Sequence, residues 1–150
     1  MCIRDSSHVV VGESKRRLRP KYRKYAGIIV DMYYDHFLSK YWENYSEVSL
    51  SQFVGNAYQV FQRRIDCLPS RIQLMLPHMI EFDWLTNYAH LEGITGALGG
   101  LSRRARYDSG MEYAVSDLKQ DYCKYKCEFE LFFPELMNFS FQQQKELDQT

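Results

Sequence analysis

The stretch PKYRKYAGIIVDMYYDHFLSKYW, residues 20–42, decides the fold class. Proline suits the first turn of a helix, and after Pro20 only Gly27 disfavours helix within the stretch. When these residues are placed on a helix at about 100° per residue, one broad sector is apolar. The members of that sector are Ile29, Val30, Tyr33, Tyr34, Phe37 and Tyr41. The stretch therefore predicts a long helix that turns one face towards a core.

Helical patterns also follow this stretch. A second helix is expected over about residues 50–67, where Ser49 or Ser51 can provide the N-cap. Its expected core positions are Phe53, Ala57, Val60, Phe61 and Ile65. A third helix is expected over about residues 70–90, and Pro77 should bend or interrupt it.

The remaining segments complete an all-α pattern. The glycine-rich residues 91–102 predict a short helix that ends near Gly99 and Gly100. The last strong helix is expected over about residues 109–133, with Pro134 ending it. No segment of useful length alternates as a strand does, so the sequence predicts an all-α bundle of five to six helices.

The chain of 150 residues is long enough for one domain with its own core. Residues 1–7 show no periodicity and are interpreted as a non-native remnant. Residues 8–139 are expected to form a single helical domain, and residues 140–150 a polar, frayed tail.

Composition excludes several functional classes. Nineteen basic residues balance nineteen acidic ones, which argues against a general nucleic-acid binder. No apolar run approaches the roughly 20 residues that a membrane-spanning helix needs. The four cysteines include no CxxC pair, so we expect no structural zinc site and no disulfide scaffold. Cys123 and Cys127 are expected to be reduced, buried thiols in a cytoplasmic protein.

Polar residues form a row along the helix predicted over residues 20–42. Asp31, Asp35 and Ser39 follow one another at intervals of four, and His36 lies about 100° away from Asp35. Large apolar side chains flank the row, so the two carboxylates are expected to need a cation. A divalent metal would satisfy them, because carboxylate and imidazole groups ligate Mn²⁺, Fe²⁺ or Zn²⁺. The alternative is that Asp31 and Asp35 pair with nearby Arg or Lys and that His36 is structural.

A basic segment, KRRLRPKYRK, spans residues 15–24. Its functional interpretation is a docking site for an anion, either a phosphate or an acidic protein surface. Candidate residues are Lys15, Arg16, Arg17, Arg19 and Arg23, and Arg103 and Arg104 could add a second contact. The alternative is an ordinary solvated helix face, and stacking on nucleic acid through Tyr22 and Tyr25 ranks third.

A family resemblance rests on residues 14–42, SKRRLRPKYRKYAGIIVDMYYDHFLSKYW. The stretch resembles the central block of the acyl carrier protein phosphodiesterase family, with its Gly-Ile-Ile-x-Asp and Tyr-Asp-His-Phe-Leu patterns. Later pieces fall in the same order: SLSQF, LPSRIQLMLPHMIEFDWLTNYAHLEGI, LSRRARYDSGMEYAVSDL and FFPEL. The resemblance covers roughly residues 13–137.

The resemblance implies an all-helical, metal-dependent phosphodiesterase distantly similar to the HD phosphohydrolases. Such enzymes, which belong to lipid metabolism, release 4′-phosphopantetheine from holo-acyl carrier protein, usually with Mn²⁺. Asp31, Asp35 and His36 match the family's Asp-x-x-x-Asp-His positions and are its implied catalytic and metal-binding residues. The basic segment would then steer the acidic carrier protein.

The sequence departs from the family at its beginning. Family members start with about fifty residues that have no counterpart here, including a His-Arg-x-x-Asp-like motif and further histidines and aspartates. We expect the remaining metal ligands to come from such a segment, and its helices to cover apolar surface. Two alternatives stay open: a non-catalytic helical module that binds an acidic protein, and a metal phosphohydrolase that acts on a small phosphoester.

Overall fold

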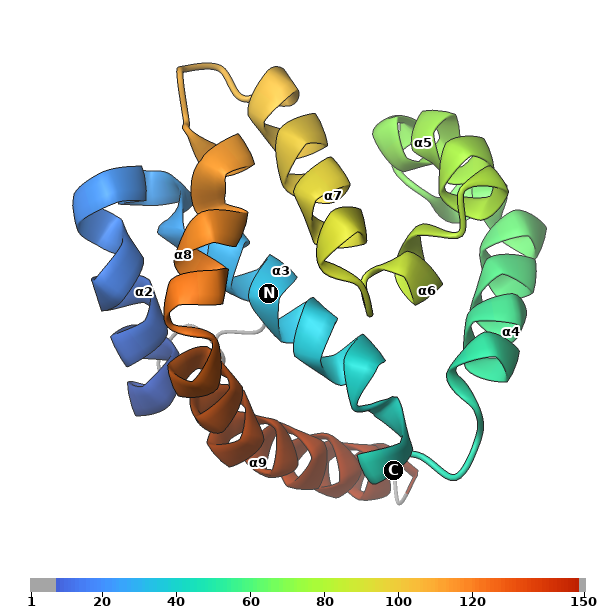
Figure 1. The fold of residues 1–150 in the computed structure, drawn as a ribbon. Helices are drawn as coiled ribbons and strands as arrows, with labels where there is room; N and C mark the ends of the chain where they lie inside the picture. Colours follow the sequence, from blue (N-terminus) through green and yellow to red (C-terminus); the bar gives the residue numbers. More distant parts are fainter. Residues whose placement is uncertain (1–7, 149–150) are drawn as a thin grey trace. The chain divides into compact units, whose positions relative to one another are not determined.

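The computed structural model describes residues 8–148, and all regular structure within them is helical. The all-α prediction is therefore confirmed (Figure 1). The expectation for residues 1–7, and Cys2 with it, lies outside the described residues. The α-helices are α2 (Val9–Tyr22), α3 (Ala26–Lys40), α4 (Leu50–Arg63), α5 (Ser70–Glu81), α6 (Trp84–Asn87), α7 (Leu91–Arg104), α8 (Ala114–Gln120) and α9 (Tyr122–Asp148). Short 3₁₀ turns are η1 (Arg23–Tyr25), η2 (Trp42–Asn44), η3 (Ile65–Cys67) and η4 (Met111–Tyr113).

The contacts of the chain group into two compact units. Unit 1 contains the described residues up to Tyr34 and those from Leu98 onward, and unit 2 spans Asp35–Ala97. Helices α3 and α7 each contribute residues to both units.

Unit 1 is organised around α9. Helices α2 and α8 both pack against it, as the blue, orange and dark red ribbons of Figure 1 show. The first turns of α3 contribute Ile29, Val30, Tyr33 and Tyr34, which are all buried as the sequence predicted. The rings of Tyr33 and Tyr125 meet edge to face at 4.9 Å, and the Tyr33 hydroxyl donates to the Ala114 carbonyl oxygen at 2.5 Å.

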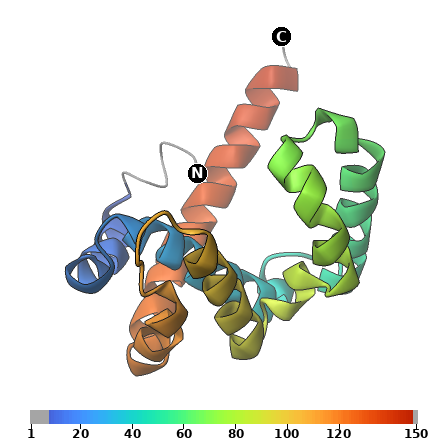
Figure 2. The ribbon, with the colours of Figure 1, turned by 90° about the horizontal axis from the view of Figure 1, so that it is seen from above.

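Unit 2 consists of α4, α5, α6 and the adjoining parts of α3 and α7. Helices α4, α5 and α6 pack on one another, and Figure 2 shows α4 and α5 as neighbouring green helices. The Tyr58 hydroxyl joins them, since it donates to the Met79 carbonyl oxygen and accepts from the Leu85 amide, each at 3.1 Å. Gly93 permits a close approach of α7, because a Cβ there would lie 2.1 Å from the Asn87 carbonyl oxygen.

The first helical boundary differs from the prediction. Residues 9–22 form a continuous helix, and His8 caps it by accepting a hydrogen bond from the Val10 amide at 3.2 Å. Pro20 therefore lies in the last turn of α2 and does not begin the following helix. The real break is at Arg23, whose φ of 49° is unfavourable for a residue with a side chain.

Three other predicted breaks are also absent. Helix α5 continues past Pro77, α7 continues through Gly99 and Gly100 to Arg104, and α9 passes Pro134 and remains helical to Asp148. A proline removes one backbone hydrogen bond, and packing on the other turns can outweigh that loss. Helix α5 instead ends just before Asp83, which adopts a left-handed conformation with a φ of 43°.

Two predictions of burial are wrong. On α4 the expected core residues Phe53, Val60 and Phe61 are 46%, 54% and 36% exposed, while Val54 and Tyr58 are buried. The apolar sector of α4 is wider than its buried face, so periodicity alone placed the face about one residue off.

The exposed cysteines have a similar explanation. Cys123 and Cys127 are exposed, as is Cys67. Tyr125 and Phe129 are buried and mark the core face of α9. Cys123 and Cys127 are each two positions from Tyr125, which places them about 200° away around the helix, on its outer side.

No helix of the described residues is long and apolar enough to cross a membrane.

Candidate functional site

His36 is fully buried in α3, and its position fixes how the imidazole can act. Its Nδ1 lies 2.8 Å from the carbonyl oxygen of Tyr88. A carbonyl oxygen only accepts, so Nδ1 carries the proton and the lone pair of the neutral ring is on Nε2. Burial lowers the pKa of His36, which favours this neutral form at neutral pH. An imidazole held in this way has the tautomer that metal-binding and general-base histidines use.

The two aspartates occupy different environments on the same helix. Asp31 is half-buried, whereas Asp35 is exposed. Ser39, the third member of the predicted row, donates to the Leu85 carbonyl oxygen at 3.3 Å and is thus engaged within unit 2. The predicted stripe walled by apolar groups is therefore divided: His36 faces the core and Asp35 faces solvent.

Asp31, Asp35 and His36 each carry a donor atom that suits a divalent metal, but they do not form an assembled metal site. Carboxylate oxygens and the Nε2 of His36 have the right chemistry for Mn²⁺ or a similar ion. Within residues 8–148, however, no three His, Cys, Asp or Glu side chains gather as metal ligands would. Asp31, Asp35 and His36 thus do not form a metal shell by themselves in the described part of the chain.

The basic segment is partly structural, because two of its cations form ion pairs within unit 1. Arg17 lies between α2 and α9 and donates to both carboxylate oxygens of Glu128, at 2.5 and 3.2 Å. These hydrogen bonds raise the pKa of Arg17, and its guanidinium also lies 4.6 Å from the centre of the Tyr125 ring. The Glu128 carboxylate additionally accepts from Ser14. Lys21 pairs with Asp117 of α8 at 2.9 Å.

The other candidate cations differ in how accessible they are. Lys15 is only 8% exposed, and its aliphatic chain lies against Gly27 of α3. Arg16 is exposed and pairs with Glu13 one turn earlier. Arg19 and Arg23 are exposed and form no ion pair within residues 8–148. An anionic partner can therefore reach the segment through Arg16, Arg19 and Arg23 more readily than through Lys15 or Arg17.

Arg103 and Arg104 end α7 and are both exposed. Their guanidinium groups lie against the glycines of the same helix: a Cβ on Gly99 would be 3.5 Å from Arg103 Nη1, and one on Gly100 3.5 Å from Arg104 Nη2. These are ordinary van der Waals distances, so the two arginine side chains do not by themselves require glycine at either position. The sequence indicated a helix end at this glycine pair, whereas α7 continues through it to Arg104.

The acidic partners Asp117 and Glu128 were missed by the sequence analysis. They lie 96 and 111 residues from the cations that they bind. The sequence did indicate that Glu128 lies close to the core, since it is one residue from the core position Phe129 of α9. Neither residue showed which basic side chain would meet it, because the pairings depend on how α2 lies against α8, which carries Asp117, and against α9, which carries Glu128.

Comparisons with known proteins agree on one family. A family model described as acyl carrier protein phosphodiesterase matches residues 4–136. A curated relative of that name from Enterobacter sp. (strain 638) is 32% identical, over 85% of this chain and 66% of its own length. One from Photorhabdus laumondii is 28% identical, over 87% of this chain and 67% of its own length.

A protein from Shigella dysenteriae serotype 1, named putative acyl carrier protein phosphodiesterase, is 33% identical over 85% of this chain and 90% of its own length. The chain spans about two thirds of the length of the Enterobacter and Photorhabdus relatives. No solved structure matches it.

Proposed function

Because the chain belongs to the acyl carrier protein phosphodiesterase family, a family of phosphoric diester hydrolases, we propose that it removes 4′-phosphopantetheine from holo-acyl carrier protein. The products would be apo-carrier protein and 4′-phosphopantetheine. The observation that carries the proposal is the family match over residues 4–136, which includes both the α3 residues and the basic segment. The distant similarity to HD phosphohydrolases stays a prediction.

The proposed roles on α3 follow from the chemistry of each side chain. His36 would act through Nε2, since Nδ1 is held by the Tyr88 carbonyl oxygen. Asp31 and Asp35 supply carboxylates four residues apart on the same helix, where side chains are about 5–6 Å apart at Cβ. These three residues would hold and orient the attacking water, with no covalent intermediate.

A divalent cation, with Mn²⁺ as the first candidate, is proposed as the cofactor. When bound, such an ion acidifies a coordinated water and polarises a phosphoryl oxygen. Residues 8–148 contain no assembled group of three ligands, so the proposal requires donors in addition to Asp31, Asp35 and His36.

The carrier protein is the proposed partner of the basic segment. Exposed cations steer an acidic partner over distances of about a Debye length, roughly 8–10 Å at physiological salt. Arg16, Arg19 and Arg23 are the exposed members of the segment, and Arg103 and Arg104 are exposed at the end of α7. Lys15 and Arg17 would support the shape of α2 and contribute less to binding.

The reaction is tested by the intact mass of the carrier protein. Holo-carrier protein is incubated with this chain and either Mn²⁺ or a chelator, and a small phosphodiester serves as a second substrate. We expect the carrier to lose its prosthetic group with Mn²⁺ and to keep it with the chelator. Asp31→Asn and Asp35→Asn should abolish this loss. The control Asp66→Asn, at an exposed aspartate of η3, should not affect it. Cleavage of the small diester alone would favour the phosphohydrolase alternative. Saturable carrier binding without cleavage, unaffected by Mn²⁺ or by Asp31→Ala, would favour the interaction module.

A further inference from the structure

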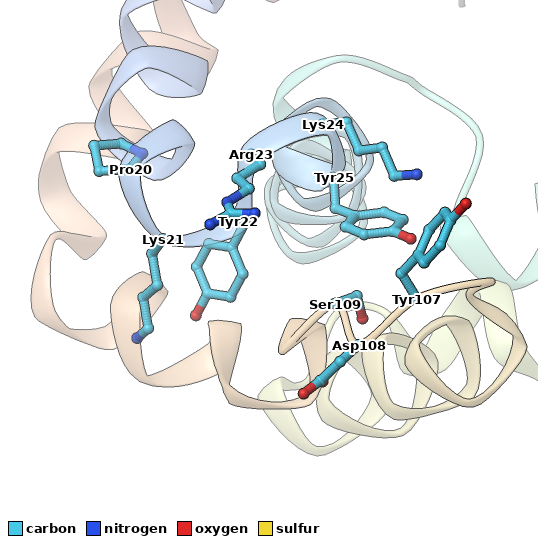
Figure 3. A pocket seen from close by; sticks show the side chains of 9 residues that line it. All are labelled: Pro20, Lys21, Tyr22, Arg23, Lys24, Tyr25, Tyr107, Asp108 and Ser109. Carbon is cyan, nitrogen blue, oxygen red and sulfur yellow. The ribbon is translucent and has the colours of Figure 1, made fainter.

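A pocket of about 550 Å³ lies in unit 1 where α2 ends. One wall comes from the end of α2 and from η1, and the other from the loop that follows α7 (Figure 3). The lining residues are Pro20, Lys21, Tyr22, Arg23, Lys24, Tyr25, Tyr107, Asp108 and Ser109. The pocket thus joins two segments that lie far apart in the sequence.

Positive charge is spread along this pocket and the adjoining loop. Lys21 donates to both carboxylate oxygens of Asp117, at 2.9 and 3.2 Å, so its charge is balanced within the fold. Arg23, Lys24 and Arg106 form no ion pair within residues 8–148. Figure 3 shows Arg23 at the Lys21 end of the pocket and Lys24 at the other end. Cations that lie apart in this way suit a partner surface with several carboxylates better than one small anion.

Tyr107 is the exposed aromatic side chain at the Lys24 end of the pocket. Its side chain is 58% exposed, and two cations approach its ring: Lys24 Nζ lies 4.4 Å and Arg106 Cζ 5.6 Å from the ring centre. Lys24 Nζ also lies 5.2 Å from the centre of the Tyr25 ring, on the same side of Figure 3. Cation–π contacts within about 6 Å restrict a flexible cation without neutralising it. We call Lys24, Arg106 and Tyr107 the Tyr107 cluster.

Asp108 is the acidic residue among those that line the pocket. Its side chain leaves the loop on the opposite side from the Tyr107 ring, as Figure 3 shows. It forms no ion pair with a cation in the described part of the chain. One carboxylate offsets only part of the charge of Arg23, Lys24 and Arg106, so the surface as a whole remains positive.

The Tyr107 cluster has the composition of a binding hot spot. Tyrosine and arginine are among the residues that most often carry the binding energy of protein interfaces. A tyrosine ring offers a large contact area with few rotatable bonds, and its hydroxyl can donate to a carboxylate. Cations already held on the ring lose less conformational freedom when a partner binds. The cluster is therefore ordered for binding before a partner arrives.

We propose that the Tyr107 cluster is the centre of the surface on which the acidic carrier protein docks. This inference rests on the proposed function and deepens it: the exposed arginines of α2 steer the carrier, and the cluster holds it. Carboxylates of the carrier pair with Lys24 and Arg106, and the Tyr107 ring is buried between the two proteins. Arg23, at the other end of the pocket, meets a further carboxylate.

The test is a calorimetric titration of the whole chain with apo-carrier protein, in the presence of a chelator. Apo-carrier protein has no prosthetic group, so hydrolysis plays no part. We expect saturable binding that weakens as the salt concentration rises. Tyr107→Ala should weaken this binding about tenfold or more, and Lys24→Ala and Arg106→Ala about fivefold each.

Matched variants assign the loss to the cluster. Tyr107→Phe keeps the ring and should stay within about threefold of the unchanged chain. Tyr113→Ala and Lys119→Ala remove another exposed tyrosine and another exposed lysine of unit 1, and each should stay within about twofold. Arg106→Glu, which reverses the charge, should weaken binding more than Arg106→Ala.

Three results would overturn the proposal. The first is the absence of saturable binding of apo-carrier protein. The second is an equal affinity for the unchanged chain, Tyr107→Ala and Lys24→Ala. The third is a single-stranded oligonucleotide that binds through the same residues more tightly than the carrier does, because the surface would then serve a nucleic acid.

Binding and cleavage are measured separately, so the two proposals can fail separately. If holo-carrier protein is cleaved while all cluster variants bind apo-carrier protein as the unchanged chain does, the docking proposal is wrong and the hydrolase proposal stands. If apo-carrier protein binds through the cluster and holo-carrier protein is never cleaved, the docking proposal stands and the hydrolase proposal is wrong.

Discussion

Replacing Glu128 by alanine tests whether Arg17 belongs to the fold or to a docking surface. The side chains of Arg17 and Glu128 are 27% and 14% exposed, so their ion pair lies between the two usual extremes. Breaking a fully buried pair costs about 3–5 kcal/mol, and an exposed pair contributes at most about 1 kcal/mol. We therefore expect Glu128→Ala to lower the free energy of unfolding by about 2–3 kcal/mol, since it leaves the guanidinium without its bidentate partner.

Urea unfolding followed by circular dichroism measures this loss. In a chain of this size a loss of about 1 kcal/mol in the free energy of unfolding lowers the melting temperature by roughly 2–4 °C. In thermal unfolding, Glu128→Ala should therefore lower the melting temperature by about 5–10 °C. Glu13→Ala is the matched control: it removes the exposed partner of Arg16 and should cost less than about 0.5 kcal/mol. A double-mutant cycle with Arg17→Met should give a coupling above about 1 kcal/mol. Equal losses in the two glutamate variants, or no coupling, would refute the structural role of Arg17.

Three further predictions follow from single contacts. Gly93→Ala should destabilise the chain by about 2 kcal/mol or more, because its Cβ would lie 2.1 Å from a carbonyl oxygen. Gly96→Ala, where the new Cβ would meet open space, should be neutral or stabilising. Thermal unfolding of both variants checks this. Burial lowers the pKa of His36, so the unfolded chain takes up this proton at a higher pH than the folded chain does. The free energy of unfolding should therefore fall as the pH drops below about 6.5. His36→Asn, which keeps a hydrogen-bond donor but does not titrate, should reduce this pH dependence in urea midpoints measured between about pH 5 and 7.5. Tyr33→Phe should cost about 1–2 kcal/mol through its lost buried hydrogen bond, and the exposed Tyr113→Phe almost nothing in the same unfolding assay.

The course of α3 was predictable from the sequence because its signal is local. Ile29, Val30, Tyr33, Tyr34 and Phe37 recur at helical spacing, and all five are buried. A face this apolar has to be buried whatever it packs against, so periodicity alone is sufficient. The same applies to Ser49, whose Oγ accepts from the Gln52 amide as an N-cap.

The helix ends were less predictable, because packing decides them. Pro20, Pro77 and Pro134 all lie inside helices, and the actual breaks at Arg23 and Asp83 are at residues with no breaking signal. Propensity weighs one or a few kcal/mol at a single residue, whereas the packing of a whole helix face contributes more.

The candidate site was recognised in part for a related reason. His36 was identified by its neighbours in the sequence, but its hydrogen bond to the Tyr88 carbonyl oxygen joins residues 52 positions apart. The basic segment was visible as a run of charge, yet only the packing of α2 on α9 shows that Arg17 is engaged by Glu128. Nor did spacing reveal that Tyr107 meets Lys24, since they come from different segments of the chain.

The most direct test of the proposed function is hydrolysis of holo-acyl carrier protein in ¹⁸O-labelled water with Mn²⁺, with both products read by mass spectrometry. The account predicts unlabelled apo-carrier protein and 4′-phosphopantetheine that carries one ¹⁸O in its phosphate, as attack of water on phosphorus requires. The Enterobacter relative, of whose length the match covers 66%, serves as the positive control. An unchanged carrier mass with this chain, also after the segment that precedes the matched region in that relative has been joined to it, would contradict the account if the relative releases the group under the same conditions.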